Sequence, residues 1–133
     1  MRSIFLILTT AIFAFADFKG INPEQLQEMI DKNITVIDIR TPPEWKEIGT
    51  ISTSKKIRFF DEKGQYDVKN WLSKFSTHIK DKNQAFVLVC RSGNRTGTVG
   101  NFLSKQLGYK NVYHLQDGIK SWIREKREVN KLN

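Results

Sequence analysis

The sequence predicts an α/β fold, because strand-like and helix-like segments alternate along its 133 residues. The clearest strand is Ala-Phe-Val-Leu-Val at residues 85–89, an unbroken apolar run typical of a parallel strand that is buried on both faces. This run leads into Cys90, the one cysteine of the chain. After a short polar turn, apolar residues recur at helical spacing over residues 99–107. A strand, a tight loop and the start of a helix are therefore expected to meet at one thiol.

The elements before this unit follow from local signals. Strands are expected at residues 18–21, 34–38 and 56–60. The first helix should begin at Asn22, because Pro23 stands at the first helical position and Gln25 completes a capping box. Asp67 is expected to cap the next helix. The apolar residues of that helix repeat with a 3.6-residue period: Val68, Trp71, Leu72, Phe75 and Ile79.

The elements after the central unit are a strand and a helix. Gly108 should end the preceding helix as its C-cap, and residues 111–115 are expected to form the next strand. Residues 116–118 then open the final helix. His114 lies within the strand without a recognisable partner, so we do not assign it as a base. No histidine pair, Cys-x-x-Cys or acidic cluster indicates a metal, and no cofactor is expected.

The N-terminal segment has the features of a signal peptide. A positive Met1-Arg2 precedes an apolar run over residues 4–15, and Ala14-Phe-Ala16 matches the A-x-A cleavage pattern. We therefore expect a signal peptide at 1–16 and a single domain at 17–133. The product would be exported, periplasmic in a Gram-negative source and secreted otherwise. The run is short for a membrane span, so no stable membrane insertion is expected after cleavage, although an uncleaved anchor or a buried first strand are alternatives.

Composition and charge suit a small globular domain that binds anions. The chain is 27% charged and 39% hydrophobic, and its formal net charge is +8. A positive field favours small anions, whereas nucleic acid is not expected because no recognition motif is present. Partners are therefore expected among small anionic molecules.

The surroundings predicted for Cys90 favour a reactive thiolate. A loop curling around the thiol would aim backbone N–H groups at it, and the helix dipole would add positive potential there. Arg91 and Arg95 add full charges. Each feature stabilises the nucleophilic form of a cysteine. A small hydrophobe ending a core strand is the alternative, but an exported protein with one unpaired thiol favours a functional role.

The loop Cys-Arg-Ser-Gly-Asn-Arg-Thr at residues 90–96 resembles the active-site loop of the rhodanese-like sulfurtransferases. In that family the cysteine accepts a sulfane sulfur as a persulfide and passes it to a nucleophile. The resemblance implies a three-layer α/β/α domain with a central parallel five-stranded sheet, and Cys90 as the catalytic residue. It also implies a substrate-binding loop of Arg91, Ser92, Gly93, Asn94, Arg95 and Thr96.

A second stretch resembles the family's Asp-x-Arg element. Asp38 ends a predicted parallel strand, so it should lie at the same sheet edge as Cys90, and Arg40 and Glu44 follow it in the chain. We expect these three residues to support the loop through charge-assisted hydrogen bonds; ordinary helix capping is the alternative. The segment 49–51, Gly-Thr-Ile, replaces the family's common Gly-His-Ile.

The function predicted by the resemblance is transfer of a sulfane sulfur from thiosulfate or a related anionic donor. The acceptor would be cyanide or a thiol, including a protein thiol, and the intermediate a Cys90 persulfide. A module that binds or carries sulfur for a partner protein without turnover is the alternative. A small phosphatase is a third option, which the C-x4-R spacing from Cys90 to Arg95 disfavours, because the related phosphatases use C-x5-R.

Overall fold

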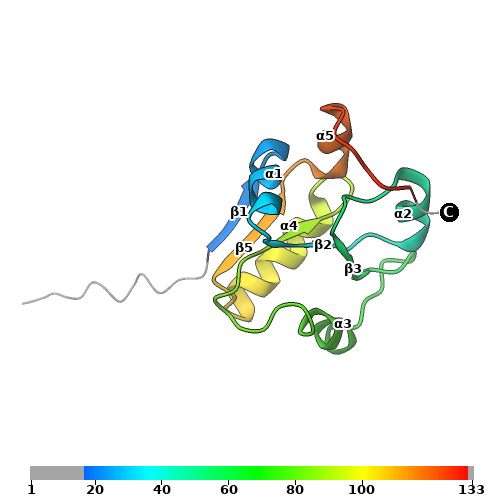
Figure 1. Ribbon diagram of the computed structural model, residues 1–133. Helices are drawn as coiled ribbons and strands as arrows, with labels where there is room; N and C mark the ends of the chain where they lie inside the picture. The colour runs from blue at the N-terminus through cyan, green and yellow to red at the C-terminus, as the bar shows by residue number, and fades with distance from the viewer. Residues whose placement is uncertain (1–16, 132–133) are drawn as a thin grey trace, which may run out of the picture.

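The computed structural model describes residues 17–131, so the expected signal peptide lies outside the described residues (Figure 1). The strands are β1 (Asp17–Ile21), β2 (Thr35–Asp38), β3 (Lys55–Lys56), β4 (Phe86–Val89) and β5 (Asn111–Leu115). The helices are α1 (Pro23–Asp31), α2 (Pro42–Ile48), α3 (Val68–Phe75), α4 (Asn94–Asn101), the π-helical η2 (Phe102–Gln106) and α5 (Gly118–Arg124). Within this part of the chain, no helix is long and apolar enough to cross a membrane.

The five strands form one parallel sheet in the order β1-β5-β4-β2-β3. This confirms the predicted α/β fold with a central five-stranded parallel sheet. Strand β4 is the middle strand, and all four of its residues are buried. Strand β4 has β2 on one side and β5 on the other, so the order of the strands reverses at this point. Ligand sites of open parallel sheets form at the carboxyl edge where the order reverses. Cys90 follows β4 at that edge.

The two faces of the sheet carry separate cores, which give the domain its three layers. On one face, Phe86 and Leu88 pack with residues of α3, α4 and η2. On the other face, Val87 and Val89 pack with residues of α1 and α5. Successive side chains of a strand point to opposite faces, so the unbroken apolar run predicted from the sequence feeds both cores. Cys90 belongs to the first cluster, on the α4 side.

Helix boundaries follow the predicted signals at their starts and depart from them at their ends. The Asn22 capping box of α1 and the Asp67 cap of α3 are present. Helix α3 ends at Phe75, short of the predicted stretch to Ile79, although Ile79 stays buried and its N–H donates to Phe75 O at 3.0 Å. Gly108 follows η2 with a φ of +78° and ends the helical segment as predicted.

The third strand is shorter than predicted. Residues 56–60 were expected to form it, but β3 spans two residues, Lys55–Lys56. The chain nevertheless continues beside β2, because Ile57 N–H donates to Asp38 O at 3.0 Å and Phe59 N–H donates to Ile39 O at 3.1 Å. Regular pairing stops because β2 itself ends at Asp38, whose carboxylate accepts a bond from the Arg40 backbone two residues on.

Candidate active site

Cys90 lies at the carboxyl end of β4 and is 1% exposed. Its side chain belongs to the same core as Phe86 and Leu88, so it faces α4. Its carbonyl oxygen accepts a hydrogen bond from Ile119 N–H of α5 at 2.9 Å. The thiol is therefore fixed between the central strand and the helices that follow it on each side.

The loop after β4 curls around the sulfur and aims hydrogen-bond donors at it. The backbone N–H groups of Gly93 and Thr96 donate to Cys90 Sγ at 3.2 and 3.4 Å, and Thr96 Oγ1 lies 3.4 Å from the same atom. The loop ends at the first turn of α4, whose dipole adds positive potential at the sulfur. The predicted cradle of backbone amides is thus present. It favours a negative charge on Sγ, which is the nucleophilic form of cysteine.

Two glycines let the loop pack tightly against the turn between β5 and α5. Gly93 adopts a φ of +99°, and a Cβ there would overlap Gln116 O. Gly118 adopts a φ of +72°, and a Cβ there would overlap the Arg91 carbonyl. The Arg91 carbonyl also accepts a bond from Lys120 N–H at 3.2 Å. The β5–α5 turn therefore packs its backbone directly against the loop at 91–96, and this close approach requires a glycine at position 93.

Arg95 is held by Glu44, one of the three residues that were expected to support the loop. Its Nη1 and Nη2 donate to the two carboxylate oxygens of Glu44 at 2.8 and 2.7 Å, a bidentate pair. Thr41 N–H and Oγ1 also donate to Glu44 Oε1, at 3.1 and 3.0 Å. Burial raises the pKa of Glu44, but the bonds from Arg95 and Thr41 outweigh it and lower the pKa from 4.5 to about 2. The hydrogen bond with Glu44 correspondingly raises the pKa of Arg95.

The predicted support of the loop by Asp38 and Arg40 through direct hydrogen bonds is wrong. Both residues are fully buried, and Arg40 Nη2 donates to Asp38 Oδ2 at 2.7 Å. Asp38 also accepts from Trp45 Nε1 at 3.0 Å, and Arg40 Nη2 donates to Gly49 O at 2.7 Å. Within residues 17–131, neither side chain hydrogen-bonds to the loop at 91–96. The pair instead holds Trp45 in the middle of α2 and Gly49 at its C-terminal end, and so positions Glu44.

His114 is a site residue that the sequence did not reveal. Its Nδ1 lies 2.8 Å from Thr96 Oγ1, the hydroxyl that also contacts the sulfur. Strand register explains the placement: His114 pairs with Leu88 on β4, two residues before Cys90. Burial lowers the pKa of His114, and the charge of Asp117 opposes that effect. The alternation of side chains along a strand was a partial signal: His114 is two residues from the apolar Val112, so both side chains should lie on the same face of the sheet. The sequence does not show that this strand pairs with the strand before Cys90, so it could not place His114 near the thiol.

The other loop residues differ in exposure. The side chains of Arg91, Ser92 and Asn94 are exposed at the rim of the loop, whereas Thr96 is fully buried. The rim is therefore polar and carries one cation that can meet an incoming anion, while the interior of the loop holds the sulfur.

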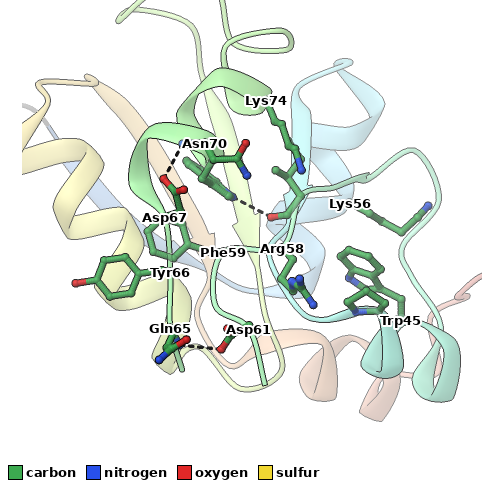
Figure 2. Close-up of a pocket in the computed structure, with 13 residues that line it drawn as sticks. Trp45, Lys56, Arg58, Phe59, Asp61, Gln65, Tyr66, Asp67, Asn70 and Lys74 are labelled. Carbon is green, nitrogen blue, oxygen red and sulfur yellow. Dashed lines mark hydrogen bonds between the residues drawn. The ribbon is translucent and has the colours of Figure 1, made fainter. Parts of the chain in front are cut away.

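Figure 2 shows a cavity of about 560 Å³ between α2, the segment after β3 and α3. Its labelled basic residues come from two segments: Lys56 and Arg58 from the end of β3 and the residues after it, and Lys74 from α3. Trp45 of α2 also borders the cavity. Its other lining residues are Pro42, Ile57, Phe59, Asp61, Gln65, Tyr66, Asp67, Asn70 and Trp71. Cys90 is not among the lining residues, so this cavity does not contain the thiol.

The curated relatives of this chain include proteins of different length and different described activity. The chain is 32% identical over 107 residues to the thiosulfate sulfurtransferase GlpE of Ectopseudomonas mendocina, covering 80% of this chain and 86% of that protein. It is 33% identical over 104 residues to the tRNA uridine(34) hydroxylase of Teredinibacter turnerae, covering 77% of this chain and 30% of that protein. The first relative is matched nearly end to end, whereas the second contains the similar region as one part of a longer chain.

Solved structures and the family pattern agree with these matches. A rhodanese-related protein from Thermoplasma volcanium is similar with a TM-score of 0.63 and 32% identity, covering 84% of this chain and 96% of that one. The sequence pattern described as the rhodanese-like domain matches residues 22–125, which include every strand from β2 to β5 and the loop around Cys90. The chain therefore belongs to the rhodanese-like domain family.

Proposed function

We propose that this protein is a sulfurtransferase that moves a sulfane sulfur from thiosulfate or a related donor to a thiophilic acceptor through a persulfide on Cys90. The observation that carries the proposal is the convergence of Gly93 N–H, Thr96 N–H and Thr96 Oγ1 on Cys90 Sγ at 3.2 to 3.4 Å. These groups stabilise a charged sulfur before and after transfer. Membership of the rhodanese-like family and the similarity to a thiosulfate sulfurtransferase support the same chemistry.

The first half-reaction is attack by the Cys90 thiolate on the sulfane sulfur of thiosulfate. A bond forms between Sγ and that sulfur, the S–S bond of the donor breaks, and sulfite leaves with the electron pair. The added sulfur carries the negative charge. In the second half-reaction, an acceptor such as cyanide attacks this outer sulfur and leaves as thiocyanate, and the Cys90 thiolate is restored. No oxidant or external proton is needed for either step when cyanide is the acceptor.

Positive charge at the rim favours an anionic donor. Arg91 is exposed beside the loop, and the chain has a formal net charge of +8. Such a field raises the local concentration of small anions and the rate of their encounter with the site. Arg95, by contrast, is engaged by Glu44, so its role is to hold the loop.

Intact-protein mass spectrometry after incubation with thiosulfate tests the proposal. The protein should gain the mass of one sulfur atom, and a reducing thiol should remove it. Cys90→Ser should gain nothing, because the chain has one cysteine. Sulfur uptake by the serine variant, or none by the wild type, would contradict the mechanism.

Two alternatives make different predictions in the same set of assays. A sulfur-carrier module would accept one sulfur but show no steady-state turnover with free thiosulfate and cyanide. A phosphatase would hydrolyse an aryl phosphate in a Cys90-dependent reaction. We expect thiocyanate to accumulate over many turnovers and aryl phosphate hydrolysis to be negligible, because the C-x4-R loop is fitted around one sulfur atom by its amides.

A further inference from the structure

The hydroxyl of Thr96 lies between the thiol and an imidazole. Its Oγ1 is 3.4 Å from Cys90 Sγ and 2.8 Å from His114 Nδ1. It is also 3.2 Å from Gly93 O, to which it can donate. A threonine hydroxyl has one hydrogen to donate and lone pairs that accept. Its single hydrogen can therefore serve the sulfur, the carbonyl or the imidazole, and the three compete for it.

His114 differs from the other two competitors because it can donate as well as accept. In a neutral imidazole, Nδ1 carries the hydrogen in one tautomer and a lone pair in the other. With the hydrogen on Nδ1, the ring donates to Thr96 Oγ1 and leaves the hydroxyl hydrogen free for the sulfur. With the hydrogen on Nε2, Nδ1 accepts the hydroxyl hydrogen, and the sulfur loses a donor.

We propose that His114 is a positioning residue for the nucleophile: by donating from Nδ1 to Thr96 Oγ1, it turns the hydroxyl hydrogen towards Cys90 Sγ. The direction follows from acceptor strength, because an ionised sulfur attracts the hydrogen more strongly than the neutral Gly93 carbonyl does. The inference rests on the proposed function only in taking Cys90 as the nucleophile.

The surroundings of His114 suit this role. Its ring packs against Phe18 of β1 with centroids 4.8 Å apart, which restricts the orientation of the imidazole. Strand neighbours are Gly20 on β1 and Leu88 on β4, neither of which is charged. Within residues 17–131, the titratable groups that act on it are Asp117 from the β5–α5 turn and Cys90 beyond Thr96. Burial lowers the pKa of His114, so the imidazole is neutral at neutral pH and its tautomer matters.

A double-mutant cycle at Thr96 and His114 tests the inference, with the pH midpoint of Cys90 alkylation by iodoacetamide as the readout. Thr96→Val should raise the midpoint by about one pH unit, as loss of a hydrogen bond to a charged group does. His114→Phe keeps a ring against Phe18 but removes both nitrogens. It should raise the midpoint by about 0.3–0.5 pH unit, which equals roughly two- to threefold slower alkylation below the midpoint, as loss of a cooperative partner does.

Coupling between the two changes distinguishes positioning from a merely structural role. If His114 acts through the hydroxyl, His114→Phe should change nothing further in the Thr96→Val background and should keep its effect in Thr96→Ser, which retains the hydroxyl. Effects that add in the Thr96→Val background would overturn the inference. His114→Asn, whose amide can donate from nearly the position of Nδ1, should restore the wild-type midpoint.

The design separates failure of this inference from failure of the proposed function, because alkylation needs no sulfur donor. Persulfide formation without coupling would leave the function in place and remove the role of His114. Coupling without persulfide formation would do the reverse. If circular dichroism shows that Thr96→Val does not fold, the alkylation midpoints of His114→Phe and His114→Asn in the wild-type background still test the inference. The midpoint of His114→Phe should then be higher than that of His114→Asn. Equal alkylation midpoints for these two variants would overturn the inference.

Discussion

Glu44 and Arg95 are 51 residues apart in the chain, yet they form a bidentate pair beside the catalytic loop, with N–O distances of 2.8 and 2.7 Å. Glu44 stands in the first turn of α2, and Arg95 in the first turn of α4. The pair therefore links two of the helices that begin at the carboxyl edge of the sheet. Because Thr96 follows Arg95 directly, movement of Arg95 would displace the donors that hold Cys90 Sγ.

Loss of this pair should loosen the loop. Arg95→Ala should lower kcat for sulfur transfer and lower the melting temperature, because Glu44 would be left part-buried without its cation. We expect a loss of stability of about 1–3 kcal/mol, measured by chemical unfolding. Arg95→Lys keeps the positive charge but cannot form the bidentate pair, so its stability and kcat should lie between those of the wild type and Arg95→Ala. A pure KM effect in Arg95→Ala would show that this side chain binds the donor instead.

Arg91 should behave differently because it is exposed. Arg91→Ala should raise KM for thiosulfate about tenfold, the lower end of the range for a charged contact, since solvent screens this position. The melting temperature and kcat should change little, as expected for loss of uniform binding. Early melting of Arg91→Ala would contradict the assignment. Steady-state kinetics at several ionic strengths check the charge dependence.

The depressed pKa of Glu44 predicts acid sensitivity. Glu44 has a folded-state pKa of about 2 against an ordinary value of 4.5. Its contribution is therefore fully present above pH 4.5 and is lost as the pH falls towards 2. Lowering the pKa from 4.5 to about 2 corresponds to roughly 3 kcal/mol. Solvent screening at this partly exposed site reduces the contribution to the order of 2 kcal/mol at neutral pH. Glu44→Gln should be less stable than the wild type at pH 7, and the difference should shrink between pH 4.5 and 2. Chemical unfolding of both proteins across this pH range measures the difference in their free energies of unfolding. A difference that does not change with pH would contradict the prediction.

Gly93 and Gly97 form a matched pair of test positions. Gly93→Ala should distort the loop and reduce turnover at least tenfold, because its Cβ would overlap Gln116 O and its φ is +99°. Gly97→Ala, within α4, meets nothing within 4 Å and should stabilise the helix by about 0.5–1 kcal/mol with activity retained. Turnover and thermal melting of both variants provide the measurement. Full activity in Gly93→Ala would mean that the loop can shift away from the β5–α5 turn.

Export remains a prediction from the sequence. If residues 1–16 are a signal peptide, the protein recovered outside the cytoplasm should begin at Asp17. N-terminal sequencing of the exported form checks this. Retention of Met1 on exported protein would replace cleavage with an anchor.

Local signals predicted the elements whose structure is set locally, and long-range pairing decided the rest. The capping residue Asn22 was predicted correctly because its partner, Gln25, is only three residues away. Strand β4 was predicted correctly because a strand that is buried on both faces has an unbroken apolar sequence. The length of β3 was wrong because Asp38 turns back onto Arg40 and ends β2. Likewise, His114 gains its role from its position opposite Leu88, which the sequence alone does not reveal.

The burial of Cys90 has a consequence for which molecules can react with it. At 1% exposure, the sulfur of one protein molecule cannot approach that of another, so air oxidation should not crosslink two copies. We expect small oxidants such as hydrogen peroxide to react with the thiol far faster than a second copy of the protein does. A protein thiol acting as acceptor would have to sit on a narrow, flexible segment that can enter the loop. Burial of the thiol should therefore restrict its reaction partners by size as well as by charge.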